Sequence, residues 1–319
     1  MNIPRVTKDF AFLAMEDEAR GDAVYIRVDQ GLNDQIIQPL HPRADQPLAL
    51  FEMNVWAVIY YPELFSDDLY EKGLSCIDEA SQARVKRFYH RADSCRTLIG
   101  RLLVRVMLKE RGMAIDPSQF AITKEGKPYI ASQVENTPVA YNITHDNNLI
   151  AMAYGPGTSH PPAFSIGVDI MKIKIPGRDT LNSFITVVGE QLTRREHDLL
   201  SPAVPDSERL KRFFWMWTLK EAYTKALGLG LGFDFRRVEF DVPEKTVRID
   251  GEIPEGWRFS MFTVHDGEEL YQGVVAQHIG DMATEILDCT NNKPEWLTIH
   301  NATTFLQKAL VVLENKESK

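Results

Sequence analysis

The chain has 319 residues, 44% of them hydrophobic and 10% aromatic, which is enough apolar material for one large or two small hydrophobic cores. Its net charge of −9 argues against a nucleic-acid-binding protein, and charges and prolines interrupt its most apolar run, so we expect neither export nor membrane insertion. Three scattered cysteines without metal-ligand spacing fit a reducing compartment, and we expect a cytoplasmic protein.

The beginning of the chain divides into an extension and a first folded half. Residues 1–50 are polar, interrupted by proline and weakly periodic, so we expect an N-terminal extension that packs on a core. That core starts with the strand candidate FEMNVWAVIYY, and the first half is expected to span 51–155. The glycines and prolines of GPGTSHPP, residues 155–162, predict a linker after it.

A basic helix is expected between Asp78 and Gly112, where leucine, valine and methionine recur at helical spacing. From Arg84 to Arg111 this stretch carries nine Lys and Arg against two acids, a net charge of +7, which leaves −16 (−9 minus +7) for the rest of the chain. A concentrated positive patch on an acidic protein indicates a small polyanion or an acidic protein partner as its ligand.

Short strands follow in FAITKEGKPYI, VAYNITHD and LIAMAYG, with turns at EGKP and HDNN. Lys127 and Pro128 lie at the first turn, and His145 and Asp146 lie at the second. Taken alone, a lysine in a charged turn and a histidine near a turn are more often surface residues than parts of a site.

The second half, expected over 163–280, opens with the strand AFSIGVDIM. Alternation along it places Gly167, Asp169 and Met171 on one face. Asp169 is a lone acid in an apolar strand, so it is either a strand-end carboxylate satisfied by backbone N–H groups or an arginine, or a hard oxygen ligand for Mg²⁺ that is approached closely beside Gly167. The remaining residues, 281–319, are expected to form a C-terminal tail ending in a helix.

The stretch FFWMWTLKEAYTKALGLGLGF is predicted to be a buried helix that ends in glycines. Trp217, Glu221 and Lys225 are four residues apart and share one face, whereas Lys220 lies about 100° round the helix from Glu221. Glu221 and Lys225 are either an exposed ion pair worth about 0.3–0.5 kcal/mol or part of a site. The glycines after Leu227 follow a helix instead of preceding one, so we interpret them as a tight turn and not as a phosphate-binding loop.

These segments together resemble the 4′-phosphopantetheinyl transferase superfamily, in its larger, pseudo-dimeric, surfactin-synthetase-activating type. The matching stretches, which together fall within about residues 84–233, are RFYHRADSCRTL, GKP, NITH, GVDIM and WTLKEAYTKALGLGL. The resemblance implies an α+β fold of two pseudo-symmetric α/β halves, each a small sheet packed on a long helix. The GVDIMK form is similar to that of the eukaryotic broad-specificity branch, which includes enzymes of lysine biosynthesis.

Enzymes of this family move the 4′-phosphopantetheine arm of coenzyme A onto a serine of an apo acyl or peptidyl carrier protein and release adenosine 3′,5′-bisphosphate. The resemblance implies that Asp169 and Glu221 bind Mg²⁺ or Mn²⁺, that Glu221 accepts the serine proton, and that Lys225 reaches the leaving phosphate. It also implies coenzyme A contacts from Arg84, Arg87, Arg91, Arg96, Lys127, Pro128, Thr144, His145, Lys220 and Lys225.

Two positions depart from the family pattern. Bacterial members often have a third acidic ligand where this chain has Met171, whose thioether does not suit Mg²⁺. Asp146 stands where related enzymes often have glutamine, so either Asp146 or water completes the metal site.

A non-catalytic module that binds coenzyme A or a carrier protein is the alternative function. Such a module would be expected to have lost Asp169, Glu221 or Lys225, and all three are present. Two similar halves in one chain indicate a monomer, and which carrier proteins it serves is open.

Overall fold

The structure is a computed structural model that describes residues 53–131, 138–158, 162–175, 177, 179–229 and 232–314. The expected N-terminal extension lies outside these residues, and so does Gly230, one of the glycines expected to form the turn after Leu227. The first half consists of β1 (Asn54–Ile59), α2 (Asp67–Ser75), α3 (Glu79–Val85), α4 (Arg91–Glu110), β2 (Phe120–Ile122), β3 (Pro128–Ile130), β4 (Val139–Asp146) and β5 (Leu149–Pro156).

The second half and the chain end contain β6 (Ile166–Lys172), α5 (Leu181–Val188), α6 (Arg194–Leu199), α7 (Asp206–Leu227), β7 (Val238–Asp241), β8 (Thr246–Ile249), β9 (Trp257–Asp266), β10 (Glu269–His278), β11 (Glu285–Asp288), β12 (Leu297–Asn301) and α8 (Ala302–Glu314). No helix in the described part of the chain is both long enough and apolar enough to cross a bilayer.

Both halves share one connectivity. In the first half, β1 leads through α4 to the hairpin β4–β5, and β5 pairs antiparallel with β1. In the second half, β6 leads through α7 to the hairpin β9–β10, and β10 pairs antiparallel with β6. The fold is therefore α+β with two similar halves, as the resemblance implied.

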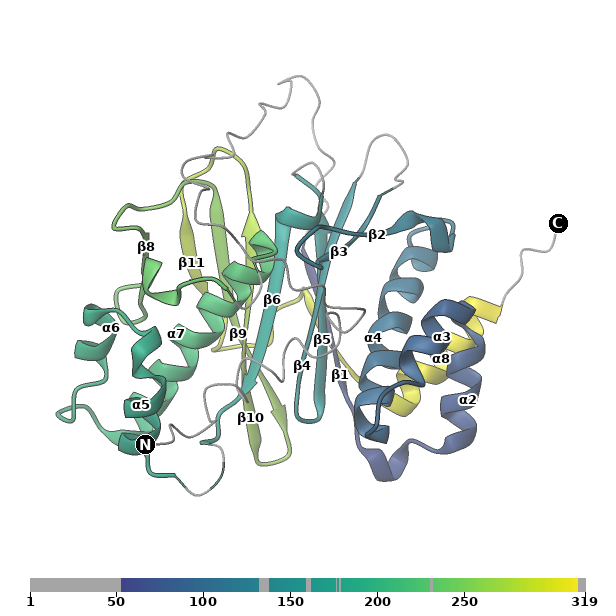
Figure 1. The fold of residues 1–319 in the computed structure, drawn as a ribbon, viewed down its shortest axis with the longest axis horizontal. Coiled ribbons are helices and arrows are strands. Elements are labelled where there is room, and N and C mark those ends of the chain that lie inside the picture. The colour runs from purple at the N-terminus through teal and green to yellow at the C-terminus, as the bar shows by residue number, and fades with distance from the viewer. Residues whose placement is uncertain are drawn as a thin grey trace, which may run out of the picture.

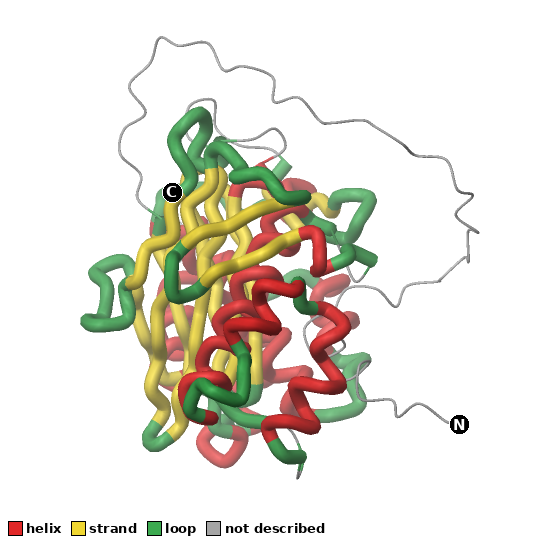
Figure 2. Tube along the Cα trace, turned by 90° about the vertical axis from the view of Figure 1, so that its left-hand side faces the viewer, coloured by secondary structure: helices red, strands yellow, loops and turns green. Residues whose placement is uncertain are grey.

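The two four-stranded sheets, with strand orders β12-β1-β5-β4 and β11-β9-β10-β6, lie between outer layers of helices (Figure 1). One core forms between α4, α8 and the first sheet, a second between α5, α7 and the second sheet, and a third where strands of both sheets pack together. Figure 2, seen from the side of α5–α7, shows these helices beside the long strands. The predicted apolar face of α4 is buried, since Leu98, Leu102 and Val106 have no exposed surface.

The segment expected as a C-terminal tail is part of both halves. β11 pairs in parallel with β9, and β12 pairs in parallel with β1. α8 then packs Phe305 and Leu306 into the first core. The expected terminal helix is present as α8, and the residues before it complete the two sheets.

The single helix expected between Asp78 and Gly112 is in fact two helices. Asp78 caps α3 by accepting a hydrogen bond from the backbone of Ser81, and α3 ends at Val85. The residues between α3 and α4 include Tyr89, whose side chain is 94% exposed, so no apolar face holds a continuous helix there.

Candidate active site

The edge strands β4 and β6 lie side by side without forming a ladder (Figure 1), and side chains join them. The backbone N–H of Val168 donates to Oδ1 of Asn142 at 2.9 Å, and the N–H of Lys172 donates to Oδ2 of Asp146 at 2.6 Å. We call this boundary between β4 and β6 the seam. Asn142 had no predicted role; its place in NITH, two residues before Thr144 on the same strand face, was the available signal.

Gly167 brings β6 into close contact with α7. A Cβ atom at this position would lie 2.2 Å from the carbonyl oxygen of Ala222 and 2.3 Å from the nitrogen of Ala226. Only glycine permits this approach. Asp169 is two residues further along β6 on the same strand face, so its carboxylate also faces α7, where it meets Lys225.

Three polar side chains meet where β4, β6 and α7 converge. The ammonium of Lys225 donates to Oδ1 of Asp169 at 2.7 Å and to Oγ1 of Thr144 at 2.9 Å. Oγ1 of Thr144 lies 3.2 Å from the same oxygen of Asp169. Both Asp169 and Thr144 are about 3% exposed, so this cluster combines residues from both halves in a largely dry place.

Glu221 lies on the same face of α7 as Lys225, one turn earlier. Burial, the largest cause, and the nearby Asp169 raise the pKa of the Glu221 carboxyl from its ordinary value of 4.5 to about 7, and Lys225 opposes the shift. Two carboxylates thus face one ammonium group. Near neutral pH, Glu221 can both hold and release a proton.

The carboxylates of Asp169 and Glu221 suit a divalent cation. Oδ2 of Asp169 is buried and has no hydrogen-bond partner in the structure. A buried carboxylate oxygen without a donor, beside a second carboxylate, is a hard oxygen pair of the kind that Mg²⁺ binds. Among the described residues no three His, Cys, Asp or Glu side chains are grouped to hold a metal ion.

Asp146 is engaged elsewhere. One of its oxygens accepts from the backbone of Lys172, and the other accepts from the side-chain amide of Asn147 at 3.0 Å. Burial is the main cause that raises its pKa, and Asp169 adds to the shift. Because both oxygens already have donors, the structure does not support the expectation that Asp146 binds the metal directly.

The basic residues expected to meet coenzyme A lie around the start of α4. Arg96 donates to the backbone oxygen of Asn147 at 2.7 Å, three residues beyond Thr144 and so about 10 Å along the chain from the cluster. Arg91 pairs with Asp67 at 2.7 Å and lies over the ring of Tyr70. Arg84 and Arg87 are exposed. Positive charge therefore borders the end of the seam nearest Asn147.

Lys127 does not point toward a ligand. Its ammonium is buried and donates to the backbone oxygens of Ile166 at 2.7 Å and Ala226 at 2.9 Å. It thus caps one carbonyl at the end of α7 and one at the start of β6, and it ties a hairpin of the first half to the second half. The side chain of Lys127 thus turns inward, and its expected contact with coenzyme A stays a prediction; Pro128 is half-buried at the start of β3.

His145 and Lys220 also lie away from the cluster. His145 follows Thr144 on β4, so its side chain is on the opposite face, the face through which Ile143 packs against the first core. Lys220 has no exposed surface and pairs with Glu196 at 2.6 Å. Its position about 100° round the helix turns Lys220 into the interior, so the structure does not support the expected coenzyme contact from its ammonium group.

Comparisons with known proteins agree on one family. Residues 165–276 match the model of the 4′-phosphopantetheinyl transferase superfamily, and residues 66–156 match a 4′-phosphopantetheinyl transferase N-terminal model. The chain is 45% identical over 262 residues to the 4′-phosphopantetheinyl transferase pptA of Paxillus involutus, which covers 81% of this chain and 98% of that protein.

More distant matches were also found. The L-aminoadipate-semialdehyde dehydrogenase-phosphopantetheinyl transferase of Rattus norvegicus is 29% identical over 197 residues, 57% of this chain and 62% of the rat protein. The crystal structure of Thermotoga maritima holo-[acyl-carrier-protein] synthase matches 36% of this chain and 63% of its own at 24% identity, with a TM-score of 0.25 that is too low to support a geometric argument.

Proposed function

The chain belongs to the 4′-phosphopantetheinyl transferase superfamily and is a transferase of phosphopantetheine to carrier proteins, and we propose that Asp169, Glu221 and Lys225 carry out this transfer with coenzyme A and Mg²⁺. The observation that carries the proposal is the convergence of these side chains at the seam, with one oxygen of Asp169 lacking a donor. Family membership makes coenzyme A the donor substrate.

Asp169 and Glu221 would hold the metal. Mg²⁺, or Mn²⁺ in its place, supplies positive charge beside the diphosphate oxygens when bound. The structural support is the donor set itself, two neighbouring carboxylates whose mutual repulsion a cation relieves.

Glu221 would act as the general base. The serine hydroxyl of the carrier attacks the β-phosphorus of coenzyme A, the bond to the bridging oxygen breaks, and adenosine 3′,5′-bisphosphate leaves. The serine proton goes to Glu221, directly or through one water. Lys225, held by Asp169 and Thr144, would offset the charge that grows on the leaving phosphate.

The basic residues around α4 would bind the phosphates of coenzyme A, and the exposed Arg84 and Arg87 would attract acidic carrier proteins. We propose that the protein acts as a monomer in the cytoplasm, a location supported by its three free thiols. The name of the rat relative suggests a carrier of aminoadipate-reductase type, and we propose acyl and peptidyl carrier proteins as further substrates.

Intact-mass measurement of several apo carrier proteins incubated with the protein, coenzyme A and Mg²⁺ tests the proposal. We expect each accepted carrier to gain one phosphopantetheine, and chelation of divalent metal to stop the reaction. A folded protein that binds coenzyme A or a carrier but modifies none of them would instead support the alternative of a non-catalytic binding module.

A further inference from the structure

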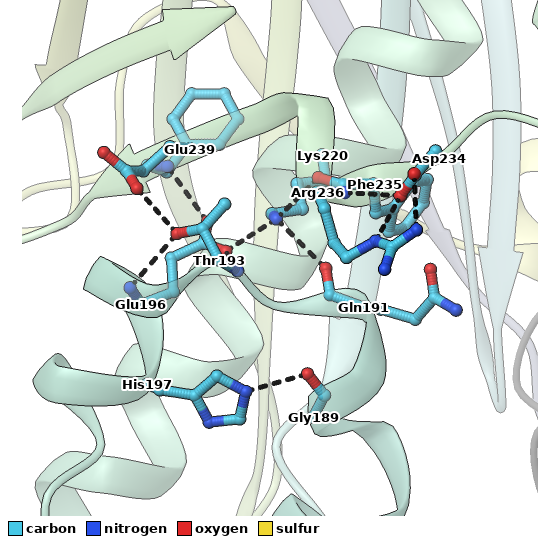
Figure 3. A network of polar contacts seen from close by, with 11 residues as sticks. Gly189, Gln191, Thr193, Glu196, His197, Lys220, Asp234, Phe235, Arg236 and Glu239 are labelled. Atoms are coloured by element: carbon cyan, nitrogen blue, oxygen red, sulfur yellow. Dashed lines mark hydrogen bonds and ion pairs between the residues drawn. The ribbon is translucent and has the colours of Figure 1, made fainter. Parts of the chain in front are cut away.

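Lys220, on α7, is the centre of a buried network of polar contacts (Figure 3). Its ammonium donates to Oε2 of Glu196 at 2.6 Å, to the backbone oxygen of Phe235 at 2.8 Å and to that of Gln191 at 3.3 Å. Neither Lys220 nor Glu196 has any exposed surface. Three acceptors match the three N–H donors of an ammonium group, so the charge is fully satisfied inside the protein.

Glu196 spreads the network to two further segments. Its Oε2 also accepts from the backbone of Thr193 at 2.8 Å, and its Oε1 accepts from the backbone of Phe240 at 3.0 Å. Thr193 in turn caps α6 and donates from its hydroxyl to Glu239. One ion pair therefore connects α7 with α6, with the 3-10 turn at Gly189–Gln191 and with β7.

Phe235 belongs to the stretch of chain that returns beside α7, which we call the return segment (residues 232–237). The helix ends at Gly228 with a φ of 68°. Eight residues of helix separate Lys220 from Gly228, about 12 Å, so the return segment lies back along α7 by more than two turns. The ring of Phe235 packs edge-on against Trp217 with 5.4 Å between ring centroids.

Trp217 is one turn before Glu221 on the same face of α7. The return segment is thus fixed at one residue by two contacts, from Lys220 to the Phe235 backbone and from Trp217 to the Phe235 ring. Both contacts come from the turns of α7 that precede and include Glu221. Nothing in the network touches the basic residues around α4.

We propose that Lys220 is a positioning residue that clamps the return segment against Trp217 and so holds the Glu221 face of α7 in its reactive place. The inference rests on the proposed function, since it assigns Lys220 to the same reaction. Loss of the clamp should lower kcat and leave coenzyme A affinity unchanged, because a shift of about 1 Å in a catalytic group can cost 10²-fold in rate.

The test uses the full chain with the double substitution Lys220→Met and Glu196→Gln, which removes both charges and so avoids an unpaired buried carboxylate. Arg209→Met is the matched control. Arg209 is a buried cation on the same helix, and it donates to Leu200, Asp206 and Asn182, each at 2.9 Å, away from the return segment.

We expect the double variant to bind coenzyme A with a Kd within about twofold of wild type and to lose about tenfold or more in kcat. Amide hydrogen exchange in peptides that cover residues 232–237 should become faster. Arg209→Met, at a similar loss of Tm, should keep both the wild-type kcat and the wild-type exchange there. A double variant with wild-type kcat and exchange would show that the pair only stabilises the fold and would overturn the proposal.

Phe235→Ala provides a second variant in case the double variant does not fold. It removes the half-buried ring over Trp217 while the backbone oxygen that Lys220 contacts remains. It should lower kcat with unchanged coenzyme A affinity, and a wild-type kcat would contradict the clamp. A wild-type protein that modifies no carrier would refute the proposed function, whereas the exchange measurement would still test the clamp.

Discussion

Lys225 and Asp169 form an ion pair of 2.7 Å between α7 and β6, and the pair leaves the second carboxylate oxygen of Asp169 buried without a donor. With Glu221 one turn away, the place holds two carboxyl groups and one ammonium group. The arrangement is therefore short of positive charge whenever Glu221 ionises. A divalent cation would correct that deficit.

Without metal, Glu221 should make the folded protein less stable as the pH rises. Its pKa of about 7 in the folded state exceeds its ordinary value of 4.5, so its contribution to stability is complete below pH 4.5 and is lost as the pH rises through 7. Glu221→Gln cannot ionise. We expect this variant to be more stable than wild type by about 1–3 kcal/mol at pH 8, where solvent screening reduces the full effect, and equally stable near pH 4.

Thermal unfolding with and without Mg²⁺ tests whether Glu221 binds the metal. Mg²⁺ should raise the Tm of wild type at pH 8 and have little effect on Glu221→Gln, since ligands stabilise the state that binds them. Equal responses of the two proteins to Mg²⁺ would show that Glu221 does not bind the metal.

Asp146→Asn should leave the Mg²⁺ requirement unchanged. The asparagine oxygen can still accept from the backbone of Lys172, so the seam persists, and each oxygen of Asp146 already accepts a hydrogen bond in the structure. Asp169→Asn should require far more Mg²⁺. The measurement is the Mg²⁺ concentration that gives half-maximal rate in each protein. An increased requirement in Asp146→Asn would restore Asp146 as a metal ligand.

Gly167→Ala should separate β6 from α7. The added methyl group would lie 2.2 Å from a backbone oxygen of α7, which cannot move without moving the helix. We expect a loss of about 3 kcal/mol or more in stability, together with a large loss of activity. Gly100→Ala on α4 is the control, because its Cβ would meet only Ile143 at an ordinary 3.5 Å. Urea unfolding compares the two, and a stable Gly167→Ala would contradict the close approach.

The sequence predicts which side chains of α7 share the face of the site better than it predicts the tertiary contacts around them. The spacing of Glu221 and Lys225 fixes their common face because a helix has 3.6 residues per turn. The same rule shows that Lys220 leaves that face, but its acceptors on Glu196 and Phe235 come from segments that only tertiary packing places there. The acceptors of Lys127, on Ile166 and Ala226, likewise come from segments that only tertiary packing places there.

The sheet edges show a second limit. β12 pairs with β1 from the far end of the chain, and the short run LTIHN carries no signal of its partner. The seam is equally hidden, since Asn142 and Asp146 accept from the backbone of β6, and a sequence pattern does not reveal which N–H groups lack a ladder partner. Resemblance to a family supplied the pairing of Asp169 with α7 that periodicity alone did not.

The most direct test of the account compares wild type with Glu221→Gln in coenzyme A binding and in the rate of holo-carrier formation, measured on the same preparations at saturating Mg²⁺. Removal of this carboxylate takes away the proton acceptor and a metal ligand but leaves the basic residues around α4 in place. We predict that kcat falls about 10²–10⁴-fold while the Kd for coenzyme A changes little. Near-normal turnover in Glu221→Gln would contradict the account and show that this face of α7 is structural.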